Sequence, residues 1–498
     1  MASLSTRIAQ AVIACAVLAG LVPLLWLVLL QKQTPLVLDP SIFAVLLFTL
    51  KQAFFSTFFS VGFGMVVARA LARRNFFGRT FVLQIFALPM AVPAIVAVLG
   101  LTSLFGESGL FPKLITLYGL PGIVMAHVFF NLPMATRIFF YGLQTVQPEN
   151  FRLAAQLNFG ERAIFRNIEW PLFESLFPRV AALVFLLCSA SFIIILTLGG
   201  ASSTTLEVAI YQSLRLDFDL PRALQLSLLQ ILLCMALVGG AAQLFQTGAV
   251  GTNLRFHITR FDQQRLASKI FDVVLIAVSI VVVLPPLLSI AMQGFFNLRV
   301  TPLTLQATFT SLGVALASAV FAMALAWPLA KSNSAQSQIT ALAAFIVPPA
   351  VLATGWFLLI FRWADTIFAT LFFIVALNSL MALPFAVAAL RIGFARITGD
   401  HMKLAQQLNF SRWQIMRRIE VPLLRRPLAQ AFLMATVLSL GDLAAITLLG
   451  SHGIITLPNL LHTQMGHYRS SDAAGTALLL LLMCAALTFV AEKSNDQI

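Results

Sequence analysis

Long apolar runs separated by short polar segments occupy the chain from one end to the other. A helix that crosses the hydrocarbon core of a bilayer needs about 20 predominantly apolar residues, and runs of that length recur. Six lie in the first part of the chain, at 9–30, 46–70, 81–105, 121–143, 175–198 and 223–246. Six more follow, at 269–293, 305–330, 339–361, 366–390, 428–449 and 473–491. The pattern predicts an all-α polytopic membrane protein with about twelve transmembrane helices.

The composition favours a bilayer over water as the surroundings of this chain. Hydrophobic residues make up 60% of it and charged residues 10%, whereas soluble domains carry about 25% charged residues. The formal net charge of +14 would suggest nucleic acid as a partner in a soluble protein. Here the basic residues lie in alternate short loops, and their bias predicts that both termini are cytoplasmic. We therefore expect the lipid bilayer, and not nucleic acid, as a partner.

The sequence also contains an internal repeat. The segment RLAAQLNFGERAIFRNIEWPL starts at Arg152, and KLAQQLNFSRWQIMRRIEVPL starts at Lys403, 251 residues later. The same spacing relates NLP at 131–133 to ALP at 382–384. The repeat divides the chain into a first half, 1–250, and a second half, 251–498, each with six predicted helices. Because six is an even number, both halves have the same orientation, which makes this a parallel repeat.

The repeated segment predicts a short helix that ends at an asparagine. A run of good helix formers precedes Asn158 in the first copy and Asn409 in the second. Asparagine tolerates the left-handed backbone conformation that such a helix end requires. Pro171 and Pro422 suit the first turn of the helix that follows. A solvated loop helix is the plain alternative, but two copies with one spacing favour paired docking surfaces for a two-fold partner.

Both segments resemble the EAA loop of bacterial ABC-importer permeases: Glu-Ala-Ala, three residues, Gly, nine residues, Ile, one residue, Leu-Pro. In the first half these positions hold Arg152, Leu153, Ala154, Asn158, Ile168, Trp170 and Pro171. In the second half they hold Lys403, Leu404, Ala405, Asn409, Ile419, Val421 and Pro422. Both copies depart from the pattern in the same way, with a basic residue for Glu and Asn for Gly. We call residues 152–171 the first repeated loop and residues 403–422 the second repeated loop.

The resemblance implies the type I ABC importer permease fold, in which these loops couple the helices to a homodimeric ATPase on the cytoplasmic side. The chain has no Gly-Lys dipeptide and therefore no phosphate-cradling P-loop. We expect a transporter subunit that is not an enzyme and binds no cofactor, with ATP and Mg held by the separate ATPase. A secondary transporter would have more charges within its helices and no need of paired loop helices. A membrane-embedded enzyme would need clustered catalytic acids or histidines.

Further segments resemble the permeases of thiamine ABC importers, which are also single chains of two fused halves. They are AHVFFNLPMATR at 126–137, TTLEVAIYQSL at 204–214, LSLGDLAAITLLG at 438–450 and HYRSSDAAGTALLLLLMC at 467–484. The resemblance implies transport of thiamine and its phosphate esters across a bacterial inner membrane, with a periplasmic thiamine-binding protein as a partner. Ferric-iron permeases are fused in the same way, so ferric iron or another small solute is the alternative substrate.

One acidic residue, Asp442, lies inside the eleventh apolar run, and Ser191 occupies the matching place in the first half. An ionisable side chain inside a membrane helix is costly and by default suggests a function. We therefore consider both residues as candidates for the translocation pathway, with a structural or gating role of Asp442 as the alternative. The four cysteines have no metal-ligand spacing, and we predict no metal site.

Overall fold

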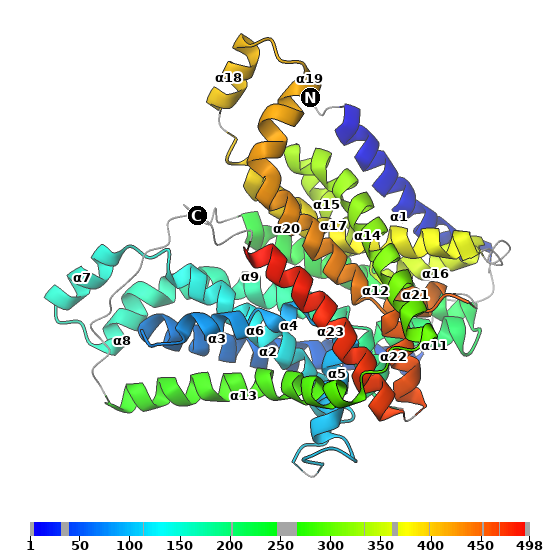
Figure 1. The fold of residues 1–498 in the computed structure, drawn as a ribbon, viewed down its shortest axis with the longest axis horizontal. Coiled ribbons are helices and arrows are strands. Elements are labelled where there is room, and N and C mark those ends of the chain that lie inside the picture. The colour runs from blue at the N-terminus through cyan, green and yellow to red at the C-terminus, as the bar shows by residue number, and fades with distance from the viewer. Residues whose placement is uncertain are drawn as a thin grey trace. The chain divides into compact units, whose positions relative to one another are not determined.

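The computed structural model describes residues 4–30, 39–112, 114–200, 203–246, 266–332, 334–360, 367–397, 399–450, 453–467 and 469–493. Every element within these ranges is a helix (Figure 1). The all-α prediction is therefore confirmed. The division of the halves at residue 250 lies outside the described residues and stays a prediction about the sequence.

The helices of the two halves follow one another in the same order. The first half contains α1 (Leu4–Leu30), α2 (Pro40–Arg73), α3 (Arg79–Ile85), α4 (Leu88–Ala91), α5 (Ala94–Phe105), α6 (Leu120–Leu143), α7 (Pro148–Gln156), α8 (Glu161–Ile164), the π-helical turn η1 (Phe165–Glu169), α9 (Trp170–Ser189), α10 (Ile193–Leu198), α11 (Leu206–Arg215) and α12 (Leu220–Gln246). The second half contains α13 (Leu266–Asn297), α14 (Pro302–Lys331), α15 (Ala335–Ile346), α16 (Pro349–Ile360), α17 (Ile367–Phe394), α18 (Gly399–Gln407), α19 (Arg412–Ile415), the π-helical turn η2 (Met416–Glu420), α20 (Val421–Leu440), α21 (Ala444–Leu449), α22 (Leu457–Gly466) and α23 (Ser470–Lys493).

Nine helical stretches among the described residues are long and apolar enough to cross a bilayer. They lie in α1, α2, α6, α8 to α9, α12, α13, α14, α17 and α23. A further apolar pair, Arg79–Ala91 and Ala94–Phe105, is bent by 110°. The expected span 81–105 is thus not one continuous helix, because Pro93 has no amide hydrogen and Val92 before it is extended (φ −84°, ψ 126°). Together these stretches make the chain a multi-pass membrane protein.

The described chain forms two compact units that do not follow the order of the sequence. The first unit comprises Leu38–Val208 and Leu232–Gln293, and the second comprises Met1–Val37, Ala209–Ile231 and Gly294–Ile498. Each unit thus includes the leading helix of the other half. In the second unit, Trp356 Nε1 on α16 donates to the carbonyl of Ala16 on α1 at 3.0 Å. In the first unit, Ser103 Oγ on α5 lies 2.5 Å from Ser289 Oγ on α13.

Equivalent helix contacts recur inside the two units. In the first, Asn131 Nδ2 on α6 lies 3.4 Å from Cys188 Sγ on α9. In the second, Asn378 Nδ2 on α17 donates to Ser439 Oγ on α20 at 2.8 Å. Small side chains let α14, α17 and α20 approach closely, as is common between membrane helices; the buried cluster there consists of Ala319, Ala322, Ala382 and Ala435.

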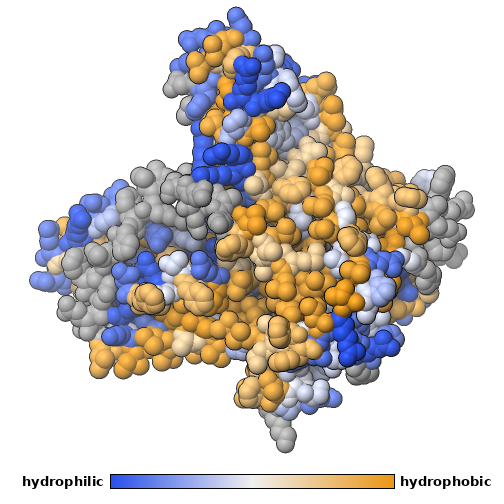
Figure 2. Space-filling view, viewed as in Figure 1, coloured by the Kyte–Doolittle hydropathy of each residue, from blue (hydrophilic) through white to orange (hydrophobic). Residues whose placement is uncertain are grey.

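Hydrophobic and hydrophilic residues are segregated on the surface. Figure 2 shows hydrophobic residues along α13 and hydrophilic residues over α7 in the first unit, and hydrophilic residues over α18 in the second. The apolar surface of α13 suits contact with lipid tails, whereas α7 and α18 are suited to water or to a protein partner.

Candidate functional site

Both repeated loops begin with a short helix that ends on a left-handed asparagine. Helices α7 and α18 are each nine residues long. Asn158 has φ 50° and Asn409 has φ 49°. The amide of Phe159 donates to the carbonyl of Ala154 at 2.8 Å, and Asn158 to Ala155 at 3.1 Å. This is a Schellman end with asparagine in place of the usual glycine, and it has the conformation that the sequence predicts.

The second loop ends its first helix in the same way. The amide of Phe410 donates to the carbonyl of Ala405 at 2.9 Å, and Asn409 to Gln406 at 3.0 Å. Ala405 and its counterpart Ala154 are both buried. A small residue at this position therefore lets the helix end fold back onto its own loop, which explains why alanine is kept in both copies.

The residues beside these alanines face outward. Leu153 and Leu404 are 55% and 52% exposed, and one turn later Leu157 and Leu408 are 57% and 55% exposed. Each loop thus presents two leucines to the surroundings at equivalent positions. Arg152 and Lys403 are also exposed, and Arg152 lies 3.9 Å from Glu149 on the same helix.

A small apolar core holds the first loop together. Phe151, Ala154 and Ile164 form it, and Ile168 packs against it. Ile419 is likewise partly buried in the second loop. Pro171 and Pro422 occupy the first turn of α9 and α20, as predicted from their missing amide hydrogen. The spacing of the repeated segment therefore reflects its structure. An exposed helix comes first, and a more buried stretch then leads into α9 or α20.

A buried glutamate at the end of each π-helical turn is a feature that the sequence analysis missed. Arg69 Nε on α2 donates to Glu169 Oε2 at 2.6 Å, and Lys331 Nζ on α14 donates to Glu420 Oε1 at 2.5 Å. Both carboxylates are almost completely buried. The repeat aligns the two glutamates with each other. An acidic residue that recurs beside an apolar span could therefore have indicated the buried ion pair.

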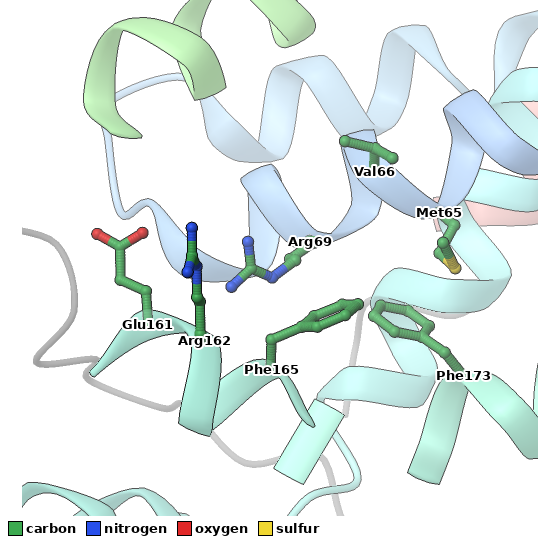
Figure 3. Close-up of a pocket in the computed structure, with 7 residues that line it drawn as sticks. All are labelled: Met65, Val66, Arg69, Glu161, Arg162, Phe165 and Phe173. Carbon is green, nitrogen blue, oxygen red and sulfur yellow. The ribbon is translucent and has the colours of Figure 1, made fainter. Parts of the chain in front are cut away.

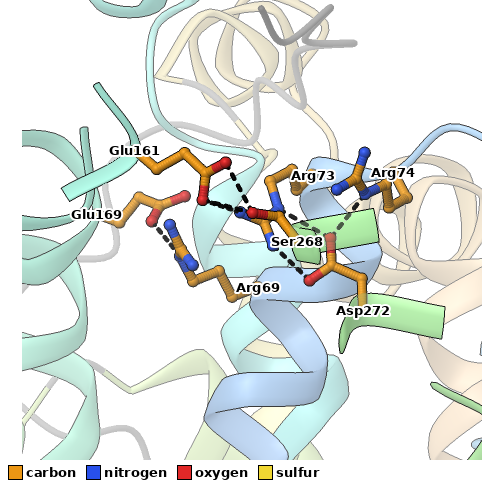
Figure 4. Close-up of polar contacts among 7 residues, drawn as sticks. All are labelled: Arg69, Arg73, Arg74, Glu161, Glu169, Ser268 and Asp272. Atoms are coloured by element: carbon orange, nitrogen blue, oxygen red, sulfur yellow. Dashed lines mark hydrogen bonds and ion pairs between the residues drawn. The ribbon is translucent and has the colours of Figure 1, made fainter. Parts of the chain in front are cut away.

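A second missed feature is a buried charge cluster that involves the first loop (Figure 4). Asp272 on α13 accepts from Arg73 Nε at 2.9 Å and from Arg74 Nε at 2.6 Å. Arg73 Nη1 also donates to Glu161 Oε2 on α8 at 3.2 Å. Ser268 Oγ on α13 donates to the same carboxylate at 2.7 and 2.8 Å. We call Arg73, Arg74, Glu161, Ser268 and Asp272 the α13 cluster.

A cavity of about 320 Å³ lies beside the first loop (Figure 3). Its lining residues are Met65, Val66, Arg69, Glu161, Arg162, Phe165 and Phe173. Arg69 also stacks over the Phe165 ring, with its guanidinium carbon 5.0 Å from the ring centroid. The cavity is therefore basic and aromatic, with one acid that the α13 cluster already engages.

The two pathway candidates, Asp442 and Ser191, lie at equivalent helix breaks. Asp442 separates α20 from α21, and Ser191 separates α9 from α10. The Asp442 carboxylate accepts from the amides of Ala444 at 3.2 Å and Ala445 at 2.9 Å. It therefore caps the start of α21, which is the usual task of aspartate at such a position. No described contact brings either residue together with a repeated loop.

Comparison with known proteins agrees with this architecture. No family model matches the chain. The thiamine transport system permease protein ThiP of Escherichia coli (strain K12) is 38% identical over 480 residues, covering 91% of this chain and 89% of that protein. The protein of the same name from Brucella abortus (strain 2308) is 37% identical over 479 residues, covering 92% and 88%.

More distant relatives fit the same picture. ThiP of Haemophilus influenzae is 34% identical over 477 residues, covering 89% of this chain and 87% of that protein. A probable sulfate transport system permease protein of Helicosporidium sp. is 30% identical over 153 residues, which is 30% of this chain. Likeness that extends through both repeats at these identities shows common descent, and the chain belongs to the family of thiamine transport system permeases.

Proposed function

We propose that this chain is the membrane-spanning subunit of an ABC importer that moves thiamine and its phosphate esters across the bacterial inner membrane by alternating access. The observation that carries the proposal is the likeness to thiamine transport permeases along about nine-tenths of the chain. The duplicated loops add a physical reason, because two equivalent surfaces suit a partner with two-fold symmetry.

The partner that fits these loops is a homodimeric ATPase. Each loop exposes a leucine pair, Leu153 with Leu157 and Leu404 with Leu408, on a helix whose far side is buried. Two exposed leucines one turn apart on a short helix are suited to an apolar groove on a partner. ATP and Mg then bind to the ATPase, and this chain supplies neither catalytic residue nor cofactor. The basic residues near both loops agree with a cytoplasmic placement of the loops and of both termini.

The substrate is delivered by a periplasmic thiamine-binding protein on the opposite side. The cavity beside the first loop is not assigned to the substrate. The cavity lies beside the loop that we propose docks the ATPase, and the Arg69 and Glu161 side chains in its lining are already paired with other residues of the chain. The proposal instead places the pathway near the helix breaks at Ser191 and Asp442.

The test of the substrate is uptake of labelled thiamine into a thiamine-requiring bacterial strain that lacks its own importer. The strain expresses this chain with its binding protein and ATPase, and the control carries an ATPase that binds ATP without hydrolysing it. We expect uptake that needs all three proteins and that is lost in the control. Absence of thiamine uptake by an assembled complex would reject thiamine, and ferric-iron uptake in the same strain would then be measured.

The role of Asp442 is tested by comparing two substitutions with different chemistry. Serine occupies the matching position in the first half and also caps helices well, so Asp442→Ser keeps the cap and removes the charge. Asp442→Ala removes both. If the charge faces the pathway, both variants lose thiamine uptake. If only the cap matters, Asp442→Ser keeps uptake, and the pathway role of Asp442 is rejected.

A further inference from the structure

The α13 cluster joins three helices within the first unit. Asp272 links α13 to the end of α2 through Arg73 and Arg74. Arg73 links α2 to α8 through Glu161, and Ser268 links α13 directly to α8 through the same glutamate. Figure 4 shows the two carboxylates on either side of the Arg73 guanidinium. The three contacts close a triangle, so α8 cannot move away from α13 without breaking at least two of them.

Burial makes this triangle costly to open. The side chains of Arg73 and Asp272 are only 2% and 3% exposed. Removing one partner from a buried ion pair leaves a charge without compensation in a medium of low polarity. Opposite charges that share several hydrogen bonds therefore stay together while the surrounding helices shift. By this argument α8, the end of α2 and the start of α13 move as one body.

The other leading helix, α1, makes different contacts at the positions that match Ser268 and Asp272. Aligning Leu4 with Leu266 also pairs Arg7 with Lys269 and Pro23 with Pro285. On this alignment Thr6 corresponds to Ser268 and Gln10 to Asp272.

Both α1 residues make neutral contacts in the second unit. Thr6 Oγ1 donates to the carbonyl of Pro328 at 3.3 Å, and Gln10 Nε2 to Ser337 Oγ at 3.2 Å. Neither partner belongs to the second repeated loop. The repeat spacing also places Arg412 of that loop opposite Glu161, so the acid that would receive such contacts is replaced by a base.

We propose that Asp272 and Ser268 are positioning residues of the first repeated loop, which tie it to the leading helix of the second half, and that Gln10, which matches Asp272, holds α1 to α15 and not to the second repeated loop. The consequence for transport rests on the proposed function. When the ATPase moves the first loop, α13 moves with it and carries the motion along the chain into α14. Because Gln10 is uncharged and contacts α15, α1 follows the second loop less closely, so the two loops transmit the work of one ATPase dimer unequally.

The first test needs only the full-length permease in detergent. Backbone hydrogen exchange is measured by mass spectrometry in both repeated loops, in wild type, Asp272→Asn and Ser268→Ala, with Gln10→Ala as the matched control. We expect Asp272→Asn to speed exchange in residues 158–169 by about tenfold and to leave residues 409–420 unchanged. Ser268→Ala is the milder variant, with about threefold faster exchange in the same residues. Gln10→Ala should change neither loop.

Three further results distinguish positioning from general stability. Asp272→Glu keeps the charge and should restore slow exchange in the first loop. Faster exchange throughout α5 and α6, to the same degree as in the loop, would show that Asp272 only stabilises the first unit. Equal acceleration of both loops, or none, in both Asp272→Asn and Ser268→Ala would overturn the proposal.

The second test uses the whole complex in proteoliposomes and measures ATP hydrolysed per thiamine imported. We expect Asp272→Asn and Ser268→Ala to raise this ratio at least about twofold while ATP hydrolysis continues, since a loosened loop passes on less of the motion. An unchanged ratio in both variants would reject the role in transport. If wild type itself shows no hydrolysis linked to thiamine, the proposed function fails, whereas the exchange measurements still decide whether Asp272 positions the loop.

Discussion

The two repeated loops share their backbone but not their anchors. Both end the first helix with asparagine at nearly the same φ, and both place a buried glutamate after one π-helical turn. The cation at that glutamate differs, however. In the first loop it is Arg69, 22% exposed, and in the second it is Lys331, 54% exposed. The two loops thus keep the same backbone because each buried glutamate has a cationic partner, and an arginine or a lysine can supply that cation.

Differences of this kind lie around the loops and not in their backbone hydrogen bonds. Helix α19 begins with a capping box between Ser411 and Gln414, whereas α8 begins at Gly160 without a side-chain cap. Instead, α8 is held by Glu161 in the α13 cluster. The first loop therefore depends on distant residues, and the second depends more on its own sequence. The following predictions test this contrast, in order of their expected effect on the free energy of unfolding.

The largest difference should come from neutralising the buried glutamates one at a time. Glu169→Gln leaves the sheltered Arg69 without a charged partner there and should lower the free energy of unfolding by about 2–3 kcal/mol. Glu420→Gln should cost about 1 kcal/mol or less, because Lys331 is half exposed and turns to water. Both variants and the exposed control Glu174→Gln are compared by SDS-induced unfolding in mixed micelles, followed by circular dichroism. Equal losses at both sites would contradict the difference in anchoring.

The next effect should be the same in both loops. Asn158→Ala and Asn409→Ala each place alanine in the left-handed region, at a cost of about 1–2 kcal/mol. Asn→Gly at either position should change stability by less than about 0.5 kcal/mol, because glycine adopts this conformation freely. The same unfolding assay checks all four variants. A large loss in only one loop would show that its asparagine does more than end a helix.

A smaller effect should separate the loops at their second helix. Ser411→Ala removes the cap of α19 and should cost about 0.5–1 kcal/mol. Gly160→Ser offers α8 the cap that it lacks and should gain no more than a few tenths, about 0.3 kcal/mol. Hydrogen exchange at the amides of 412–415 and 161–164 gives the local change. Destabilisation by Gly160→Ser would mean that the α13 cluster already fixes this turn too tightly to accept a side chain.

The smallest effect on unfolding is expected from the outward leucines. Leu153→Ser and Leu404→Ser should change the free energy of unfolding by less than about 0.5 kcal/mol, since both side chains are exposed. Each should nevertheless weaken binding of the ATPase by about tenfold, because full burial of a leucine side chain in an apolar pocket is worth about 1.5–3 kcal/mol. Pull-down of the ATPase at graded concentrations measures this. Unchanged binding in both variants would remove these leucines from the docking surface.

Much of the loop structure could be predicted from the sequence, because local chemistry determines it. The repeat spacing located both loops, the tolerance of asparagine for positive φ explained their turns, and the prolines marked the start of α9 and α20. The buried ties could not be predicted in the same way. Asp272 lies in an apolar run like that of Asp442, and nothing local indicates that its partners lie about 200 residues earlier, at Arg73 and Arg74.

Helix breaks and the packing of the leading helices were also beyond the sequence. The place of Asp442 in the pathway stays a prediction; that its carboxylate caps α21 could not be foreseen, because this role depends on a break within an apolar run. The repeat offset similarly says which helices are equivalent but not which unit each one joins. An apolar helix surface can pack against many other helices. The unit that α1 or α13 joins is therefore known only from the contacts in the structure.

The exchange of leading helices also has a consequence for the order of events during synthesis. Helix α1 leaves the ribosome before the other described helices, yet the helices that it packs against in the second unit begin with α14 at Pro302. At about 5–20 residues per second, α1 waits roughly 15–55 s for them. Its backbone hydrogen bonds are internal, so it is stable in lipid by itself during that time. The first unit likewise stays open until α13 is inserted, so neither unit is completed until the second half has begun to emerge. In a fused chain, completion of both units requires only that synthesis continue. Two separate half-chains would first have to meet by diffusion in the membrane.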